Sequence, residues 1–96
     1  MEKKLEALKE LIEIVERLRG PGGCPWDQKQ TLKNMGRYLL EEASEVVDAS
    51  DGGSGEATSD VCEELGDTLM NIILAARISE ESGGFSLTEV SREISA

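Results

Sequence analysis

Apolar side chains recur at three- and four-residue steps along most of the chain, which is the spacing of an amphipathic helix. The first stripe predicts a helix over residues 2–18 and consists of Leu5, Leu8, Leu11, Ile12, Val15 and Leu18. A second helix is predicted from about Thr31 to Ala49, with the stripe Leu32, Met35, Leu39, Val46 and Ala49. No strand-like alternation of apolar and polar residues occurs, so the pattern favours an all-α fold.

Two further helices are predicted after a connector at residues 51–57, DGGSGEA, which is rich in glycine and serine. The third helix should begin near Ser59 or Asp60, both good N-cap residues, and continue to about Glu81. Residues 69–78 are apolar around most of the helix and should be buried on several sides. A capping box at residues 86–89 opens a fourth helix, which the chain end should cut short.

Four helices with short connectors are typical of an antiparallel four-helix bundle, here a single domain spanning residues 1–96. Between the first two helices, residues 19–30 have the sequence RGPGGCPWDQKQ. This stretch shows no usable periodicity and contains several glycine and proline residues, so we expect a loop.

Charge and composition narrow the possible functions. The chain of 96 residues has 20 acidic and 10 basic side chains, a net charge of −10, so nucleic acid and anionic membranes are poor candidate partners. It has no histidine, which excludes Ser-His-Asp and Cys-His hydrolases and any histidine-ligated metal. Cys24 and Cys62 are expected to be reduced thiols, and the charged N-terminus is unlike a signal peptide. We therefore expect a cytoplasmic protein.

Acidic residues form two clusters on the predicted helices. Glu42 and Glu45 lie one turn apart on the second helix, at the edge of its apolar stripe. Glu64 and Asp67 have the same spacing on the third helix, and Asn71 lies one turn beyond Asp67. Two antiparallel neighbouring helices would bring the four acids together.

A hard divalent cation would relieve the repulsion between these acids, because Mg²⁺ accepts carboxylate oxygens and completes its shell with water and phosphate. The absence of histidine favours Mg²⁺ or Mn²⁺ over zinc or iron. The alternative is that both clusters are ordinary solvated helix faces. The sequence pattern leaves these two interpretations about equally supported.

Four segments resemble the MazG nucleotide pyrophosphohydrolase family. The run LRGPGGCPWD at residues 18–27, followed by Gln30 and Thr31, is similar to the signature loop of that family. Residues 38–45, YLLEEASE, resemble its E-E-x-x-E helix. Residues 63–67, EELGD, resemble its E-x-x-D helix, and Phe85-Ser86-Leu87 resembles the entry to its last helix. The similarity covers nearly the whole chain in the right order.

The resemblance implies an all-α fold in which a homodimer, or a higher even oligomer, builds a four-helix bundle. It also implies Mg²⁺-dependent hydrolysis of a nucleoside triphosphate to the monophosphate and pyrophosphate. Carried over by position, the metal ligands would be Glu42, Glu45, Glu64 and Asp67. Glu41 and Glu45 would act in catalysis, and the substrate would contact Trp26, Lys29 and Asn71. For Trp26, a hydrophobic plug on the glycine-rich loop is an equally good interpretation.

Relatives usually continue with a basic tail where this chain reaches Ser95 and Ala96. One alternative is therefore a non-catalytic helical interaction module that retains the fold. The other is a pyrophosphohydrolase of the same fold with a narrower substrate range, such as dUTP, dCTP or phosphoribosyl-ATP.

Overall fold

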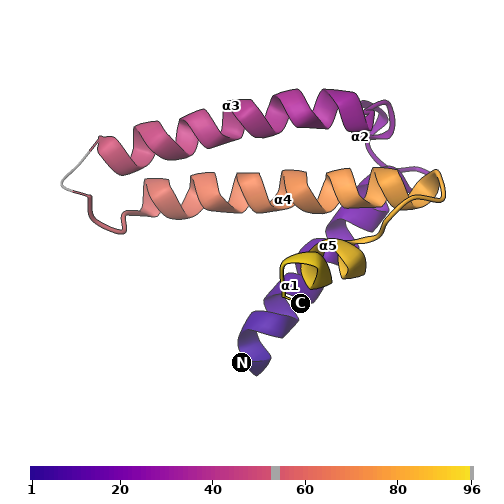
Figure 1. The fold of residues 1–96 in the computed structure, drawn as a ribbon, viewed down its shortest axis with the longest axis horizontal. Coiled ribbons are helices and arrows are strands. Elements are labelled where there is room, and N and C mark those ends of the chain that lie inside the picture. The colour runs from indigo at the N-terminus through magenta and orange to yellow at the C-terminus, as the bar shows by residue number, and fades with distance from the viewer. Residues whose placement is uncertain (53–54, 96) are drawn as a thin grey trace.

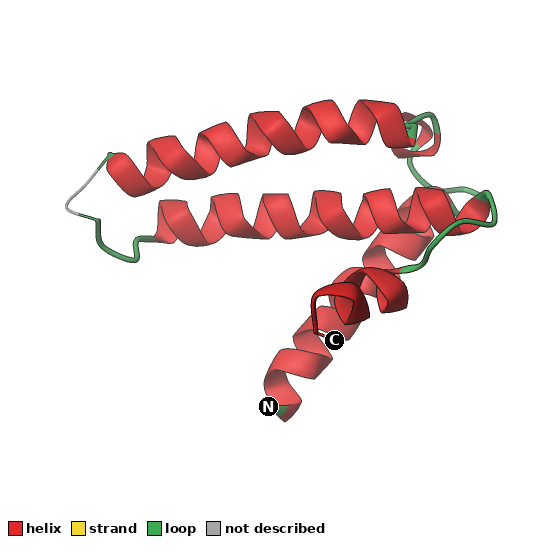
Figure 2. Ribbon diagram, viewed as in Figure 1, coloured by secondary structure: helices red, strands yellow, loops and turns green. Residues whose placement is uncertain are grey.

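The computed structural model describes residues 1–52 and 55–95. Within them the chain forms helices and no strands (Figure 2). The helices are α1 (Glu2–Arg19), α2 (Pro25–Gln28), α3 (Leu32–Asp51), α4 (Ser59–Glu81) and α5 (Leu87–Ser95). The predicted all-α class is confirmed.

Helices α3 and α4 form an antiparallel hairpin and lie side by side along their length (Figure 1). Helix α1 contacts α2 and one end of α4, while α5 contacts α4. Figure 1 shows α1 and α5 running obliquely to the hairpin instead of parallel to it. One chain therefore supplies one antiparallel pair of long helices, and a four-helix bundle completed by a second chain stays a prediction.

The helix ends largely follow the side-chain signals in the sequence. The Thr31 hydroxyl accepts a hydrogen bond from the Asn34 backbone N–H at 3.2 Å, which caps α3. The hydroxyl of Thr58 does the same for the Val61 N–H at 3.3 Å, so the N-cap of α4 is Thr58 and not the predicted Ser59 or Asp60. Helix α3 ends two residues beyond the predicted Ala49. The rest of the predicted connector includes residues 53 and 54, which lie outside the described residues.

The short helix α2 lies inside the segment predicted to be a loop. Its four residues are too few to show a helical period, and Pro25 at its first position suits a helix start. The glycines before it are needed sterically. Gly22 has φ = 76°, and a Cβ on Gly23 would lie 2.3 Å from the Arg17 carbonyl oxygen.

The core lies where α1, α3 and α4 meet. Its fully buried side chains are Val15, Met35 and Leu74, with Ile73 and Ala76 nearly as buried. Only the C-terminal half of α1 takes part, because Leu5 and Leu8 are exposed where α1 extends away from the hairpin (Figure 1). The apolar segment 69–78 is also only partly covered, since Leu69 is 41% and Ile72 37% exposed.

Candidate metal centre

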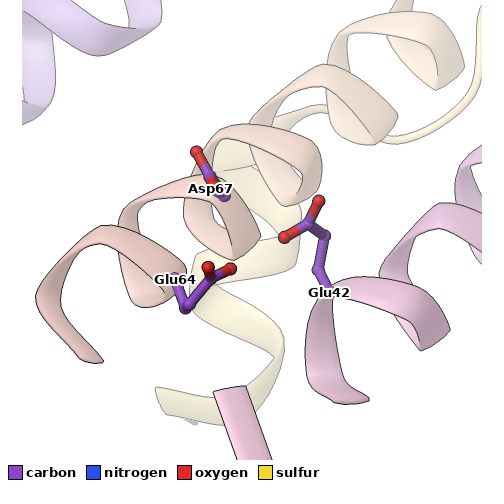
Figure 3. Close-up of side chains that lie close together, drawn as sticks. All are labelled: Glu42, Glu64 and Asp67. Carbon is purple, nitrogen blue, oxygen red and sulfur yellow. The ribbon is translucent and has the colours of Figure 1, made fainter. Parts of the chain in front are cut away.

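The α3–α4 hairpin brings together acidic residues that are far apart in the sequence. Glu42 projects from α3 toward Glu64 and Asp67 on α4 (Figure 3). One carboxylate oxygen from each residue lies within 4.8 Å of the corresponding oxygens of the other two. The antiparallel pairing of α3 and α4 produces this convergence, since the sequence spacing alone sets only the positions within each helix.

The three carboxylates differ in their exposure. Glu42 and Glu64 are half-buried, and Asp67 is exposed. The Oε2 atom of Glu42 is buried and has no hydrogen-bond partner among the described residues. A buried carboxylate oxygen without a partner is costly, so this atom calls for a ligand that the chain itself does not provide.

Burial and neighbouring charges raise the pKa of two of these carboxyls above the ordinary value of 4.5. For Glu42, desolvation contributes most, followed by the negative charges of Asp67, Glu45 and Glu41. For Glu64, desolvation is again first, followed by the charges of Glu45, Asp67, Glu42 and Glu63. The raised pKa values mean that the folded chain disfavours a full set of negative charges at this site.

These features fit a hard divalent cation. The donors are carboxylate oxygens, which suit Mg²⁺ or Mn²⁺. The orphaned oxygen of Glu42 and the mutual repulsion of the cluster would both be relieved by a positive charge. An exposed acidic cluster would be expected to keep its carboxylates solvated, whereas here one carboxylate oxygen is buried.

The fourth predicted ligand, Glu45, lies outside the close group of three. It is exposed on α3, one turn after Glu42, and near enough for its charge to raise the pKa of both Glu42 and Glu64. Glu41 is exposed beside Glu42, and its charge raises the pKa of Glu42. Glu41 and Glu45 therefore lie at the rim of the cluster.

The predicted substrate-binding residues lie on two segments. Asn71 is half-buried on α4, one turn after Asp67. Lys29 is exposed at the C-terminal end of α2. Trp26, on α2, is 54% exposed and packs against Tyr38 with their ring centroids 5.5 Å apart.

Tyr38 is not among the site residues predicted from the sequence. It lies four residues before Glu42 on α3, so the two side chains share one face of the helix, one turn apart. The Trp26–Tyr38 pair is thus next to the acidic cluster along α3. The four-residue spacing between Tyr38 and Glu42 was the available signal, but the contact with Trp26 depends on how the loop folds back.

The site is partly open to solvent in a single chain, since Asp67 is exposed and Glu42 and Glu64 are half-buried. A hollow of about 530 Å³ lies near the end of α1, but it is lined by residues between Glu13 and Gly22 and by none of the candidate site residues.

In the part of the chain that the structure describes, no helix is long and apolar enough to cross a bilayer.

Comparison with known proteins identifies similar sequences. A family model described as the MazG nucleotide pyrophosphohydrolase domain matches residues 30–96. YabN from Bacillus subtilis, named as an uncharacterized protein, is 44% identical over 82 residues, which is 85% of this chain and 16% of YabN.

Two named enzymes are similar at the same level. The nucleoside triphosphate pyrophosphohydrolase/pyrophosphatase MazG of Thermotoga maritima is 41% identical over 85 residues, 88% of this chain and 32% of that protein. The nucleoside triphosphate pyrophosphohydrolase of Escherichia coli K12 is 40% identical over 86 residues, again 88% of this chain and 32% of the relative. The chain thus spans about a third or less of the length of these relatives.

Proposed function

The chain belongs to the MazG nucleotide pyrophosphohydrolase family, and from this premise we propose that it hydrolyses nucleoside triphosphates to the monophosphate and pyrophosphate, with Mg²⁺ as cofactor. The observation that carries the proposal is the convergence of Glu42, Glu64 and Asp67 with a buried, unpartnered oxygen on Glu42. The names of the relatives from Thermotoga maritima and Escherichia coli support the reaction type.

Glu42, Glu64 and Asp67 would hold the ion, with Glu45 as a further ligand. Bound there, Mg²⁺ supplies positive charge that neutralises the phosphate oxygens and lets an acidic surface accept a polyanion. Manganese is the alternative ion for the same oxygen donors.

Glu41 and Glu45 are the proposed catalytic groups. Both are exposed at the rim of the cluster, where a carboxylate oxygen can accept a hydrogen bond from the attacking water and take its proton. The water oxygen forms the new bond to phosphorus, and the bond between the α and β phosphates breaks to release pyrophosphate. A carboxylate must be ionised to take this proton.

The Trp26–Tyr38 pair supports one direction for the bound nucleotide. With its phosphates at the carboxylates, a nucleotide would extend one turn along α3 toward Tyr38 and the exposed face of Trp26. Aromatic rings can stack on a base without strong base selectivity. Lys29, near Trp26 on the same segment, would contact the phosphates or the base, and Asn71 is a further polar contact on α4.

We also propose that the functional unit is a homodimer or a higher even oligomer. Leu65, Leu69 and Ile72 repeat at helical spacing on α4, and they are 52%, 41% and 37% exposed. On α3, Leu40 and Val47 are also exposed. Such a surface is typical of an interface, and a second α3–α4 pair packed there would complete a four-helix bundle.

The experiment that tests the function combines metal binding with turnover. Calorimetric titration should show that the wild-type chain binds Mg²⁺, and that Glu42→Gln with Asp67→Asn removes this binding. A panel of nucleoside triphosphates should release pyrophosphate only when Mg²⁺ is present, and EDTA should stop the reaction.

Substitution at the rim separates catalysis from folding. Glu45→Gln should lower kcat by about 10²–10⁴-fold, the usual effect of losing a catalytic group, while the melting temperature stays close to that of the wild type. Glu13→Gln, an exposed acid on α1, is the matched control and should leave kcat unchanged. Metal binding without turnover of any nucleotide would contradict the enzyme and favour a binding module.

A further inference from the structure

Arg19 lies at the end of α1 and connects two parts of the chain. Its side chain is only 8% exposed. The Nη1 atom donates hydrogen bonds to the backbone carbonyl oxygens of Asp27 at 2.6 Å and Gln30 at 3.2 Å. On its other side, Nε donates to the Glu81 carboxylate at 3.1 Å, and Nη2 donates to the second oxygen of that carboxylate.

This arrangement suits the electrostatics of α2. The Asp27 carbonyl lies in the last turn of that helix, where the backbone dipoles favour a positive charge, and the Gln30 carbonyl lies two residues beyond its end. Glu81 fixes the guanidinium from the opposite side, and the hydrogen bond from Arg19 lowers the pKa of the Glu81 carboxyl, so that it stays ionised.

Helix α2 needs this external support. A helix of four residues has too few internal hydrogen bonds to be stable by itself. Two other contacts also hold the segment: the Gln28 side chain donates to the Gly20 carbonyl at 2.6 Å, and the Cys24 N–H donates to the Leu18 carbonyl at 3.0 Å. Arg19 is the contact that ties α2 to the end of α4.

We propose that Arg19 is a positioning residue for nucleotide binding: through the carbonyls of Asp27 and Gln30 it holds α2 so that Trp26 stays against Tyr38 beside the acidic cluster. The inference rests on the proposed function, because the nucleotide is what Trp26 would contact. Lysine cannot replace Arg19 fully, since one ammonium group cannot reach both carbonyls and both oxygens of a carboxylate in the same fixed geometry.

The test uses Trp26 as its own probe, because it is the single tryptophan of the sequence. Arg19→Lys and Glu81→Gln should each increase quenching of Trp26 fluorescence by acrylamide, measured without nucleotide or metal. The matched control is Arg77→Gln. Arg77 contacts the same Glu81 carboxylate at 3.4 Å, yet it makes no hydrogen bond to α2 within the described residues, so its loss should leave the quenching unchanged.

Kinetics then show whether the position of α2 matters for the substrate. Arg19→Lys should raise KM for the nucleoside triphosphate about tenfold with kcat nearly unchanged, the signature of lost binding without lost chemistry. The affinity for Mg²⁺ measured by calorimetry should stay that of the wild type. Arg77→Gln should leave KM unchanged.

The outcomes distinguish the role of Arg19 in holding α2, its role in nucleotide binding, and the proposed function. Wild-type quenching in Arg19→Lys would overturn the role of Arg19 in holding α2. Increased quenching with an unchanged KM would overturn its role in nucleotide binding. A wild-type chain that turns over no nucleotide would contradict the proposed function instead, and the quenching measurement would still decide whether Arg19 holds α2.

Discussion

Replacing Glu42 by glutamine should stabilise the metal-free chain and at the same time remove its stabilisation by Mg²⁺. The two effects have opposite signs because one carboxylate both repels its neighbours and would bind the ion. The substitution keeps the size of the side chain and removes its negative charge.

The size of the first effect follows from the separation of the carboxylates. The three carboxylate oxygens lie no more than 4.8 Å from one another. At that distance two unit charges repel by about 0.9 kcal/mol in water, and salt at physiological ionic strength reduces this to about 0.5 kcal/mol. Glu42 faces two such neighbours, Glu64 and Asp67. Removing its charge should therefore stabilise the chain by about 1 kcal/mol, or about 4–8 °C in melting temperature for a domain of this size.

The pH dependence of stability tests the sign of this first effect separately. The pKa of Glu42 is raised in the folded chain, so the contribution of this one carboxyl to wild-type stability is largest below about pH 4.5 and is lost as the pH rises through its folded-state pKa. The advantage of Glu42→Gln should therefore be present at pH 7 and disappear below about pH 4.5. Melting curves at the two pH values measure this difference.

The second effect is measured by repeating the melts at pH 7 with increasing Mg²⁺. At 100 times the dissociation constant, a ligand that binds only the folded state adds about 2.7 kcal/mol. The wild type should show such a rise, and Glu42→Gln should not. Glu13→Gln, which removes an exposed charge on α1 and outside the group of three, is the control and should keep the Mg²⁺ response. A lower metal-free melting temperature in Glu42→Gln, or a full Mg²⁺ response, would refute this reasoning.

Three further outcomes are expected. Because the hydrogen bond from Arg19 lowers the pKa of Glu81, this carboxyl stabilises the fold above about pH 4.5 and loses that effect as the pH falls, so Glu81→Gln should flatten urea-unfolding stability between pH 7 and pH 3. Gly23→Ala should lower the melting temperature, since its Cβ would lie 2.3 Å from a carbonyl oxygen. Gly36→Ala, in open space within α3, should instead add about 0.5–1 kcal/mol to the free energy of unfolding. Equal effects of the two substitutions would contradict the steric argument. Leu69→Glu should shift light scattering from an oligomer to a monomer, and a wild type that is already monomeric at micromolar concentration would refute the interface.

The helices could be predicted from the sequence because their signals are local. Stripes of apolar residues and the capping threonine at position 31 act within one or two turns, and the predicted long helices match α1, α3 and α4 closely. Helix α2 could not be found in this way, because four residues are too few to show a helical period. Its support comes from hydrogen bonds that the side chains of Arg19 and Gln28 donate to backbone carbonyls, and these follow no helical spacing.

The candidate site was predictable in part, because the spacing of acids within one helix is also a local signal. Spacing identified Glu42 and Glu45 as one pair and Glu64 and Asp67 as another, but the register between α3 and α4 decides which acids meet. In one chain that register brings Glu42 to Glu64 and Asp67, while Glu45 stays outside this group. The roles proposed for Tyr38 and Arg19 depend on contacts across the loop. For Arg19 these contacts join residues 8 to 62 positions apart, and no local pattern encodes them.

The identity of the reaction products tests the central claim most directly. Phosphorus NMR of a nucleoside triphosphate incubated with the chain and Mg²⁺ separates pyrophosphate from orthophosphate, and the monophosphate from the diphosphate. The account predicts that monophosphate and pyrophosphate appear in equal amounts and that neither forms with Glu42→Gln combined with Asp67→Asn. Formation of the diphosphate and orthophosphate would contradict it.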